Sequence, residues 1–236
     1  MPCNTQNLYQ PGQKECTPMD EGRETVQPAH RAKEEKKQDA HLAWEVRKRH
    51  EACRLRVFHV QELESVSPRK TVRRFVTLTA PEWVIVVPHV MERAQRFFVM
   101  VRQWRCGSQT VCTEFPGGVI DAGEHPEAAA RRELFEETGR RASSLAHLGT
   151  IHPNPAVLEN RVHIFSAECT PEVREPQLDT DEFLERCVLP VHDVYERMGR
   201  APFDHALMAQ PSFFFCGRIR FPPCNSVRYV ACSASI

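Results

Sequence analysis

The stretch that decides the fold is "EFPGGVIDAGEHPEAAARRELFEETG", residues 114–139, in which carboxylates crowd beside a double glycine. Its second half carries residues that are typical of the start and the end of a helix. Pro126 suits a first helical turn, and Gly139 supplies a stop at the carboxyl end. We therefore predict a helix over residues 126–138, preceded by a glycine-containing loop.

Acidic residues gather on one side of this predicted helix. Glu133, Glu136 and Glu137 fall within about a 100° arc, whereas Leu134 and Phe135 project toward the opposite side and can enter a core. Like charges at this spacing oppose helix formation by roughly 0.2–0.5 kcal/mol per pair. The arrangement therefore favours a cationic partner on the acidic side.

A divalent cation is the partner that these ligands suit. Mg²⁺ and Mn²⁺ accept carboxylate and carbonyl oxygens and keep waters that a substrate phosphate can replace. Gly117 and Gly118 permit tight backbone geometry that can expose a carbonyl to the same ion, and Glu124 lies just before the helix. The alternative is an ordinary solvated acidic face, which composition alone would favour.

The spacing of the motif decides between these two interpretations. The stretch resembles the signature box of the Nudix hydrolases, with the family's intervals between Gly118, Glu124, Arg132-Glu133-Leu134, Glu136-Glu137 and Gly139. A chance match in such a chain is on the order of one in a million or rarer. Arg140 departs from the pattern, because the family prefers an apolar residue there. We expect this departure to affect packing at the helix end more than metal binding.

The resemblance implies a fold and a chemistry. Nudix domains are α+β proteins, built as α/β/α sandwiches around a mixed β-sheet. They hydrolyse a nucleoside diphosphate linked to another group, using Mg²⁺ or Mn²⁺. Transferred to this sequence, the resemblance implies metal ligands at Glu133, Glu136, Glu137 and the carbonyl of Gly117. It also implies catalytic roles for Glu136 and Glu137, and for Arg132 the task of orienting a box glutamate.

Residues outside the box indicate the substrate. The segment "VRQWRCGSQTVCTEF", residues 101–115, is similar to the ADP-ribose and ADP-sugar pyrophosphatases. The resemblance implies substrate-binding roles for four residues, each with a structural alternative. Arg105 would contact phosphate or be solvated, and Trp104 would stack on a base or pack. Glu114 would bind adenosine or ribose or shape its loop. Pro155 stands where the ADP-ribose pyrophosphatases tend to have a proline, and it would also shape its own loop.

A base that activates water is the remaining requirement for hydrolysis. In the related pyrophosphatases an acidic loop after the box often contributes, and here the candidates are Asp179, Asp181 and Glu182. The alternatives are a solvated loop and a box glutamate acting as the base.

Three functions remain open on the sequence. The first is hydrolysis of ADP-ribose or an ADP-sugar to AMP and a sugar phosphate. The second is the same chemistry on another nucleotide sugar or a dinucleotide. The third is a domain that binds a nucleotide without turnover, against which the intact box glutamates argue.

Apolar patterning outside the box predicts the remaining elements. Residues 54–67 and 73–80 alternate like an antiparallel pair of strands. Further strands are predicted over 82–90, 96–105, 110–115, 145–151, 161–168 and 182–189. Residues 190–198 should form a helix, and a last helix should begin near residue 203 and be interrupted by Pro211.

Four regions follow from these patterns. Residues 1–40 are predicted to be a disordered or loosely ordered extension, and residues 41–80 a β-strand region that pairs two copies into a homodimer. Residues 81–215 form the predicted Nudix domain, and residues 216–236 an atypical tail that is dispensable for chemistry.

Composition narrows the partners and the compartment. The 236 residues carry a formal net charge of +0, which gives no bulk signal for nucleic acid. No apolar run approaches the ~20 residues of a membrane span, and the first thirty residues do not resemble a signal peptide. The ten cysteines contain no CxxC pair, so reduced thiols are expected. We expect a cytoplasmic protein whose partner is a nucleotide sugar.

Overall fold

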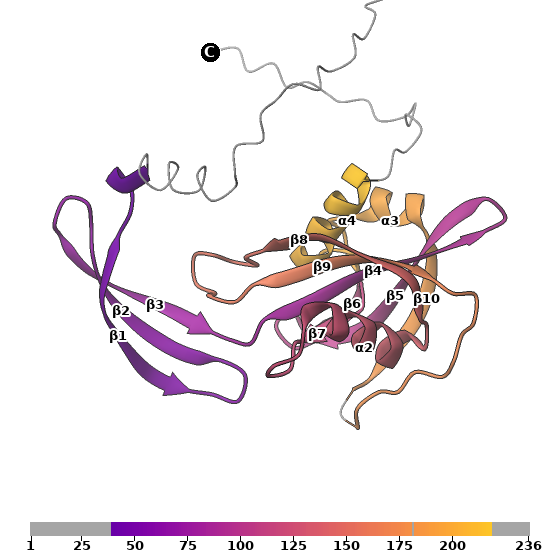
Figure 1. The fold of residues 1–236 in the computed structure, drawn as a ribbon, viewed down its shortest axis with the longest axis horizontal. Coiled ribbons are helices and arrows are strands. Elements are labelled where there is room, and N and C mark those ends of the chain that lie inside the picture. Colours follow the sequence, from indigo (N-terminus) through magenta and orange to yellow (C-terminus); the bar gives the residue numbers. More distant parts are fainter. Residues whose placement is uncertain (1–38, 181, 219–236) are drawn as a thin grey trace, which may run out of the picture. The chain divides into compact units, whose positions relative to one another are not determined.

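The computed structural model describes residues 39–180 and 182–218, and Figure 1 shows their fold. The centre is a mixed seven-stranded sheet in the order β10-β5-β4-β9-β8, in which β6 pairs with β5 and β7 pairs with β4. Its strands are β4 (Trp83–Glu92), β5 (Gln95–Arg105), β6 (Thr110–Glu114), β7 (Gly117–Val119), β8 (Ala142–Ile151), β9 (Val162–Cys169) and β10 (Leu184–Pro190).

Helices cover both faces of this sheet. The helices are α2 (Pro126–Thr138), α3 (Val191–Arg197) and α4 (Ala206–Arg218). Successive side chains of β4 point to opposite faces of the sheet and so enter two separate cores. Ile85 and Val87 pack with residues of α3 and α4, whereas Val84 and Val86 pack with residues of α2. The predicted α/β/α sandwich is thus confirmed (Figure 1).

The helix α2 has the predicted bounds because local chemistry determines both of its ends. At the start, Pro126 occupies the first turn and the side chain of His125 accepts a hydrogen bond from the backbone of Glu127. At the end, Gly139 adopts φ +67° and its N–H donates to the carbonyl of Phe135. A β-carbon at Gly139 would lie 1.8 Å from the carbonyl oxygen of Arg174, so glycine is required there.

The N-terminal region forms a separate three-stranded antiparallel sheet, β1-β2-β3. The predicted pair corresponds to β2 (His59–Val66) and β3 (Val72–Thr79). The sequence did not indicate β1 (Glu45–Arg54), whose residues "EVRKRHEACR" lack apolar alternation and are all exposed. Its strand conformation comes from pairing with β2 rather than from burial of one face.

The prediction for the last helix was partly wrong, because α4 begins at Ala206 and runs through Pro211. Burial explains this, since Met208 and Phe215 on either side of the proline both enter the core. The hydroxyl of Ser212 also donates to the carbonyl of Met208 at 2.8 Å, which supports the backbone beside the proline.

Some of the predictions concern residues outside the described ranges. Most of the predicted extension (1–40) and most of the predicted tail (216–236) lie outside residues 39–180 and 182–218. A short 3-10 helix, η1 (Asp39–His41), begins the described chain. None of the helices within the described ranges is long and apolar enough to cross a membrane.

Candidate active site

Two carboxylates of α2 are buried against the double glycine. Glu133 and Glu137 are only 8% and 4% exposed. The Oε2 atom of Glu137 accepts a hydrogen bond from the N–H of Gly117 at 3.1 Å. A β-carbon at Gly118 would lie 2.5 Å from Oε1 of Glu133, so the loop approaches the helix as closely as a glycine allows.

Arg132 gathers the acidic groups around the helix. Its Nε and Nη2 atoms donate to Glu124 at 3.0 and 2.9 Å, and its Nη1 donates to Glu133 at 2.8 Å and to Glu136 at 3.1 Å. Nη2 also donates to the carbonyl of Val119 at 3.1 Å. One guanidinium thus connects the loop before the helix with two carboxylates on it.

The surroundings of the two buried carboxylates disfavour their ionised forms. Burial, reinforced by the charge of Glu133, raises the pKa of Glu137 to about 8. Burial also raises the pKa of Glu133, although Arg132 opposes the shift. A buried acid with a raised pKa is a group that a bound cation would stabilise in its ionised form.

The donor set fits a hard divalent ion by its chemistry, since every candidate ligand is an oxygen. Within the described ranges, no group of three or more acidic, histidine or cysteine side chains is already arranged to hold a metal ion. Arg132 holds Glu133 and Glu136, while Glu137 is turned to the N–H of Gly117. These carboxylates would have to reorient from Arg132 and Gly117 to bind an ion.

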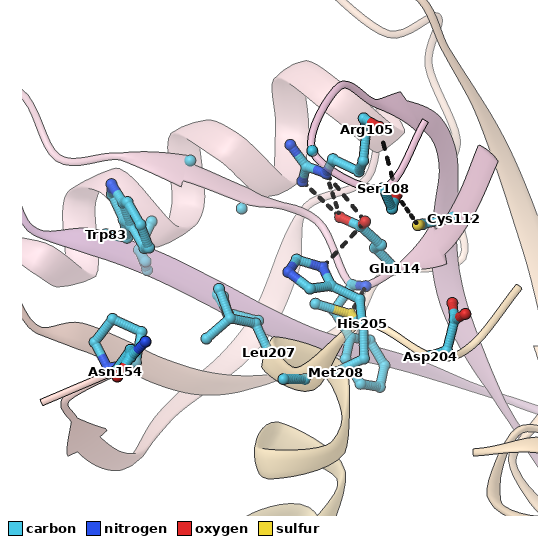
Figure 2. A pocket seen from close by; sticks show the side chains of 18 of the residues that line it. Trp83, Arg105, Ser108, Cys112, Glu114, Asn154, Asp204, His205, Leu207 and Met208 are labelled. Atoms are coloured by element: carbon cyan, nitrogen blue, oxygen red, sulfur yellow. Dashed lines mark hydrogen bonds and ion pairs between the residues drawn. The ribbon is translucent and has the colours of Figure 1, made fainter. Parts of the chain in front are cut away.

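A cleft of about 740 Å³ includes both residues of the double glycine in its lining, and Figure 2 shows it from close by. Its size lies in the range of small-molecule sites. Its lining includes the apolar side chains of Trp83, Leu158 and Leu207 and the polar side chains of Arg105 and His205. Gly117 and Gly118 belong to its wall, and the same two glycines lie against the buried carboxylates Glu137 and Glu133.

A buried ion pair forms the polar wall of this cleft. Glu114 on β6 is completely buried, and the Nε of Arg105 on β5 donates to both of its oxygens at 3.0 Å. His205 approaches from the opposite side, with Nδ1 3.1 Å from Oε1 of Glu114. Burial alone would raise the pKa of Glu114, but His205 and Arg105 together lower it to about 2.

Comparison with known proteins identifies the family. A family model described as "NUDIX domain" matches residues 82–210, which is more than half of the 236-residue chain. The chain belongs to the Nudix family.

Relatives of this Nudix protein match it over part of their length. It is 36% identical over 96 residues to an "ADP-ribose pyrophosphatase" of Bacillus subtilis (strain 168), covering 40% of this chain and 52% of that protein. It is 33% identical over 122 residues to an "ADP-sugar pyrophosphatase" of Mus musculus, covering 49% and 56% respectively. The chain thus spans about half the length of these curated relatives.

A solved structure supports the Nudix fold. The protein described as "Crystal structure of ADP compounds hydrolase" is similar with a TM-score of 0.63, over 74% of this chain and 93% of that chain. The two sequences are 24% identical, so this likeness concerns the fold.

The structure brings the predicted box residues of this Nudix protein together, but it separates the predicted substrate residues. Arg105 and Glu114 lie in the cleft wall, where they bind each other. Trp104 is 56% exposed and Pro155 is exposed, and neither is among the residues that line the cleft. Alternation along β5 explains why Trp104 does not line the cleft, since neighbouring residues of a strand face opposite sides and Arg105 faces the cleft.

Of the three predicted loop acids, Glu182 acts on the buried carboxylates. After burial and nearer charges, its negative charge further raises the pKa of both Glu133 and Glu137. Asp179 donates its backbone N–H to Oε2 of Glu182 at 3.2 Å. Asp181 lies outside the described residues.

Trp83 and His205 are among the cleft residues that were not predicted from the sequence. Trp83 opens a strongly apolar strand and gave no sign beyond core packing, yet it lines the cleft. His205 precedes α4 and belongs to no recognisable motif. It reaches Glu114 only because α4 packs across the sheet, a contact between residues 91 positions apart.

Proposed function

We propose that this Nudix protein hydrolyses the pyrophosphate bond of ADP-ribose or a close ADP-sugar, giving AMP and a sugar phosphate. The observation that carries the proposal is the pair of buried carboxylates, Glu133 and Glu137, which lie against the two glycines of the cleft wall. The names of the Bacillus subtilis and mouse relatives support the choice of substrate.

Metal ligands on this proposal are Glu133, Glu136 and Glu137, with the carbonyl of Gly117 as a further oxygen. A Mg²⁺ or Mn²⁺ ion bound there would neutralise charge on the pyrophosphate and make a water more acidic. Arg132 already contacts Glu133 and Glu136, so it limits where these two carboxylates can point. The ionised form of Glu137, disfavoured by burial alone, would become the stable form.

Arg105 is the phosphate-binding residue in this proposal. Its Nε and Nη2 atoms are bound to Glu114, which holds the planar guanidinium in one orientation. Within the described residues, Nη1 has no hydrogen bond and is available for a phosphate oxygen. The charge of Arg105 also acts on Glu137, which supports placing the phosphates between the arginine and the carboxylates.

A proton acceptor for the attacking water is the next role. We assign it to Glu182 or to a box glutamate, because Glu182 acts electrostatically on both buried carboxylates.

The nucleobase of the substrate has an apolar surface to lie against in this proposal. Trp83 and Leu207 supply this wall of the cleft.

The test is a nucleotide panel assayed for AMP and phosphate-ester products with Mg²⁺, with Mn²⁺ and with EDTA. ADP-ribose, ADP-glucose, UDP-glucose, NADH and diadenosine polyphosphates would separate the substrate classes. We expect metal-dependent cleavage that is fastest for ADP-ribose or an ADP-sugar. Binding of ADP-ribose without turnover under any metal would contradict the proposal and favour a non-catalytic domain.

A further inference from the structure

His205 lies where the wall of the cleft meets the buried ion pair. It immediately precedes α4, and its side chain is 30% exposed and lines the cleft. Its Nδ1 atom lies 3.1 Å from Oε1 of the fully buried Glu114. The imidazole thus stands between a buried carboxylate and the space that a substrate would occupy (Figure 2).

The carboxylate determines which ring nitrogen carries the proton. Nδ1 is shielded from solvent and makes no hydrogen bond of regular geometry with any described group, but Oε1 of Glu114 lies 3.1 Å away and can accept one. Because the guanidinium of Arg105 keeps Glu114 ionised, its oxygens accept hydrogen bonds and do not donate. Nδ1 therefore carries hydrogen, which leaves a lone pair on Nε2 in the neutral ring.

The second nitrogen faces the opposite way. Figure 2 shows Nε2 turned away from Glu114 toward the open part of the cleft. An unprotonated Nε2 accepts a hydrogen bond, so it pairs with a donor and not with a phosphate oxygen. Phosphate oxygens are themselves acceptors, and Arg105 is the neighbouring group with hydrogens for them.

We propose that His205 is a substrate-positioning residue whose Nε2 accepts a hydrogen bond from a sugar hydroxyl of the nucleotide sugar, with Glu114 fixing the tautomer. The inference rests on the proposed function and adds a selection for sugars that carry a free hydroxyl at this point. Arg105 and His205 then share one carboxylate but read different parts of the substrate, the first a phosphate and the second a hydroxyl.

Two amide variants separate the two nitrogens of the ring. His205→Asn keeps an N–H near the position of Nδ1 but has no atom at Nε2, whereas His205→Gln extends an amide toward the position of Nε2. We expect His205→Asn to raise KM for ADP-ribose about 10-fold, the scale of one lost hydrogen bond, with kcat within about 2-fold. We expect His205→Gln to remain within about 3-fold of wild-type KM.

A surface histidine supplies the matched control. His192 on α3 lies 3.2 Å from Glu196 with its side chain 61% exposed, so His192→Asn removes a comparable pair away from the cleft. This variant should match wild type in KM and kcat. A wild-type KM in His205→Asn, or an equal loss in His205→Asn and His205→Gln, would overturn the assignment.

Binding of product fragments identifies the sugar, measured by calorimetry on wild type and His205→Asn. Weaker binding of ribose 5-phosphate supports a contact to the terminal sugar. Weaker binding of AMP but unchanged binding of its 2′,3′-dideoxy analogue supports a contact to the nucleoside ribose. An equal loss for AMP and the dideoxy analogue, without any effect on ribose 5-phosphate, would indicate a base contact and overturn the proposal.

A measurement on the wild-type protein does not depend on any variant folding. Long-range ¹H–¹⁵N correlation spectra at about pH 8 should show His205 as the Nδ1-protonated tautomer, with Nε2 shifting on addition of the fragment that binds. The opposite tautomer would overturn the assignment. Absence of metal-dependent hydrolysis in wild type would refute the proposed function, whereas an active wild type with an unaffected His205→Asn refutes only the role of His205.

Discussion

The carboxylate of Glu133 fills the space that a side chain at Gly118 would need. A β-carbon there would lie 2.5 Å from Oε1 and 2.7 Å from Cδ of Glu133, well inside van der Waals contact. Gly118 is therefore required for a steric reason. It keeps the loop and the acidic side of α2 in direct contact.

The variant Gly118→Ala should displace Glu133 while leaving the fold in place, because the clashing atoms are the far end of a flexible side chain. We expect metal-dependent hydrolysis to fall roughly 10- to 100-fold, the scale of an approximately 1 Å misplacement of a catalytic group. Steady-state kinetics and a thermal melt would check it. Gly217→Ala, where a β-carbon meets nothing within 4 Å, is the control and should retain activity.

Removing the charge of Glu137 should abolish most turnover. Glu137→Gln keeps the shape of the side chain and its helix propensity, since Glu and Gln rank together. We expect hydrolysis of ADP-ribose to fall by roughly 10²–10⁴, as when one electrostatic or acid–base element is lost. Glu127→Gln is the control, because Glu127 lies on the same helix, half-exposed and paired with Arg131 at 3.1 Å. Equal activity of Glu137→Gln and wild type would refute the metal-site assignment.

The stability of the metal-free protein should depend on pH through Glu137. The pKa of this group is about 8 in the folded protein, above its ordinary value of 4.5. Between these two values the unfolded chain has released the proton and the folded chain retains it, so rising pH favours unfolding. In EDTA, the melting temperature of wild type should therefore fall relative to that of Glu137→Gln from about pH 5 to about pH 8.

Mg²⁺ supplies the counter-experiment to that pH series. A cation that binds the ionised carboxylate stabilises the folded state by mass action, so saturating Mg²⁺ should narrow the gap at about pH 8. A gap between wild type and Glu137→Gln that is constant across the pH range would show that Glu137 does not titrate in this window.

The N-terminal strands should pair two copies of the chain. In the three-stranded sheet, β1 and β3 expose several large apolar side chains, among them Val46, Val72, Phe75 and Val76. We expect light scattering to give a dimer mass at micromolar concentration. The variant Phe75→Glu should shift the mass toward the monomer, and a monomeric wild type would refute the prediction.

Local chemistry made the core of the site predictable. Both ends of α2 follow from Pro126 and Gly139, and the spacing of the glutamates places them on one side whatever the rest of the chain does. Arg140, the departure from the family pattern, is buried and donates to the carbonyl of Thr170 at 3.4 Å. Burial lowers the pKa of its guanidinium.

Features that depend on distant contacts were not predictable. The strand β1 has no pattern of its own, and Pro211 reads as a helix breaker until the burial of Met208 and Phe215 is known. The pairing of His205 with Glu114 needs α4 to be placed over the sheet. Propensity describes neighbours in sequence, and these features are set by neighbours in space.

The start of α4 has a consequence for how such a protein can be retargeted. Residues 204–208 and the β5–β6 hairpin line the cleft, whereas the buried carboxylates come from α2. The cleft residues 204–208 are therefore encoded about seventy positions after the buried carboxylates, although the β5–β6 hairpin lies much nearer to α2 in the sequence. A library confined to residues 204–208 would vary the contacts to the substrate, while the proposed metal ligands stay unchanged because no residue of the box is altered.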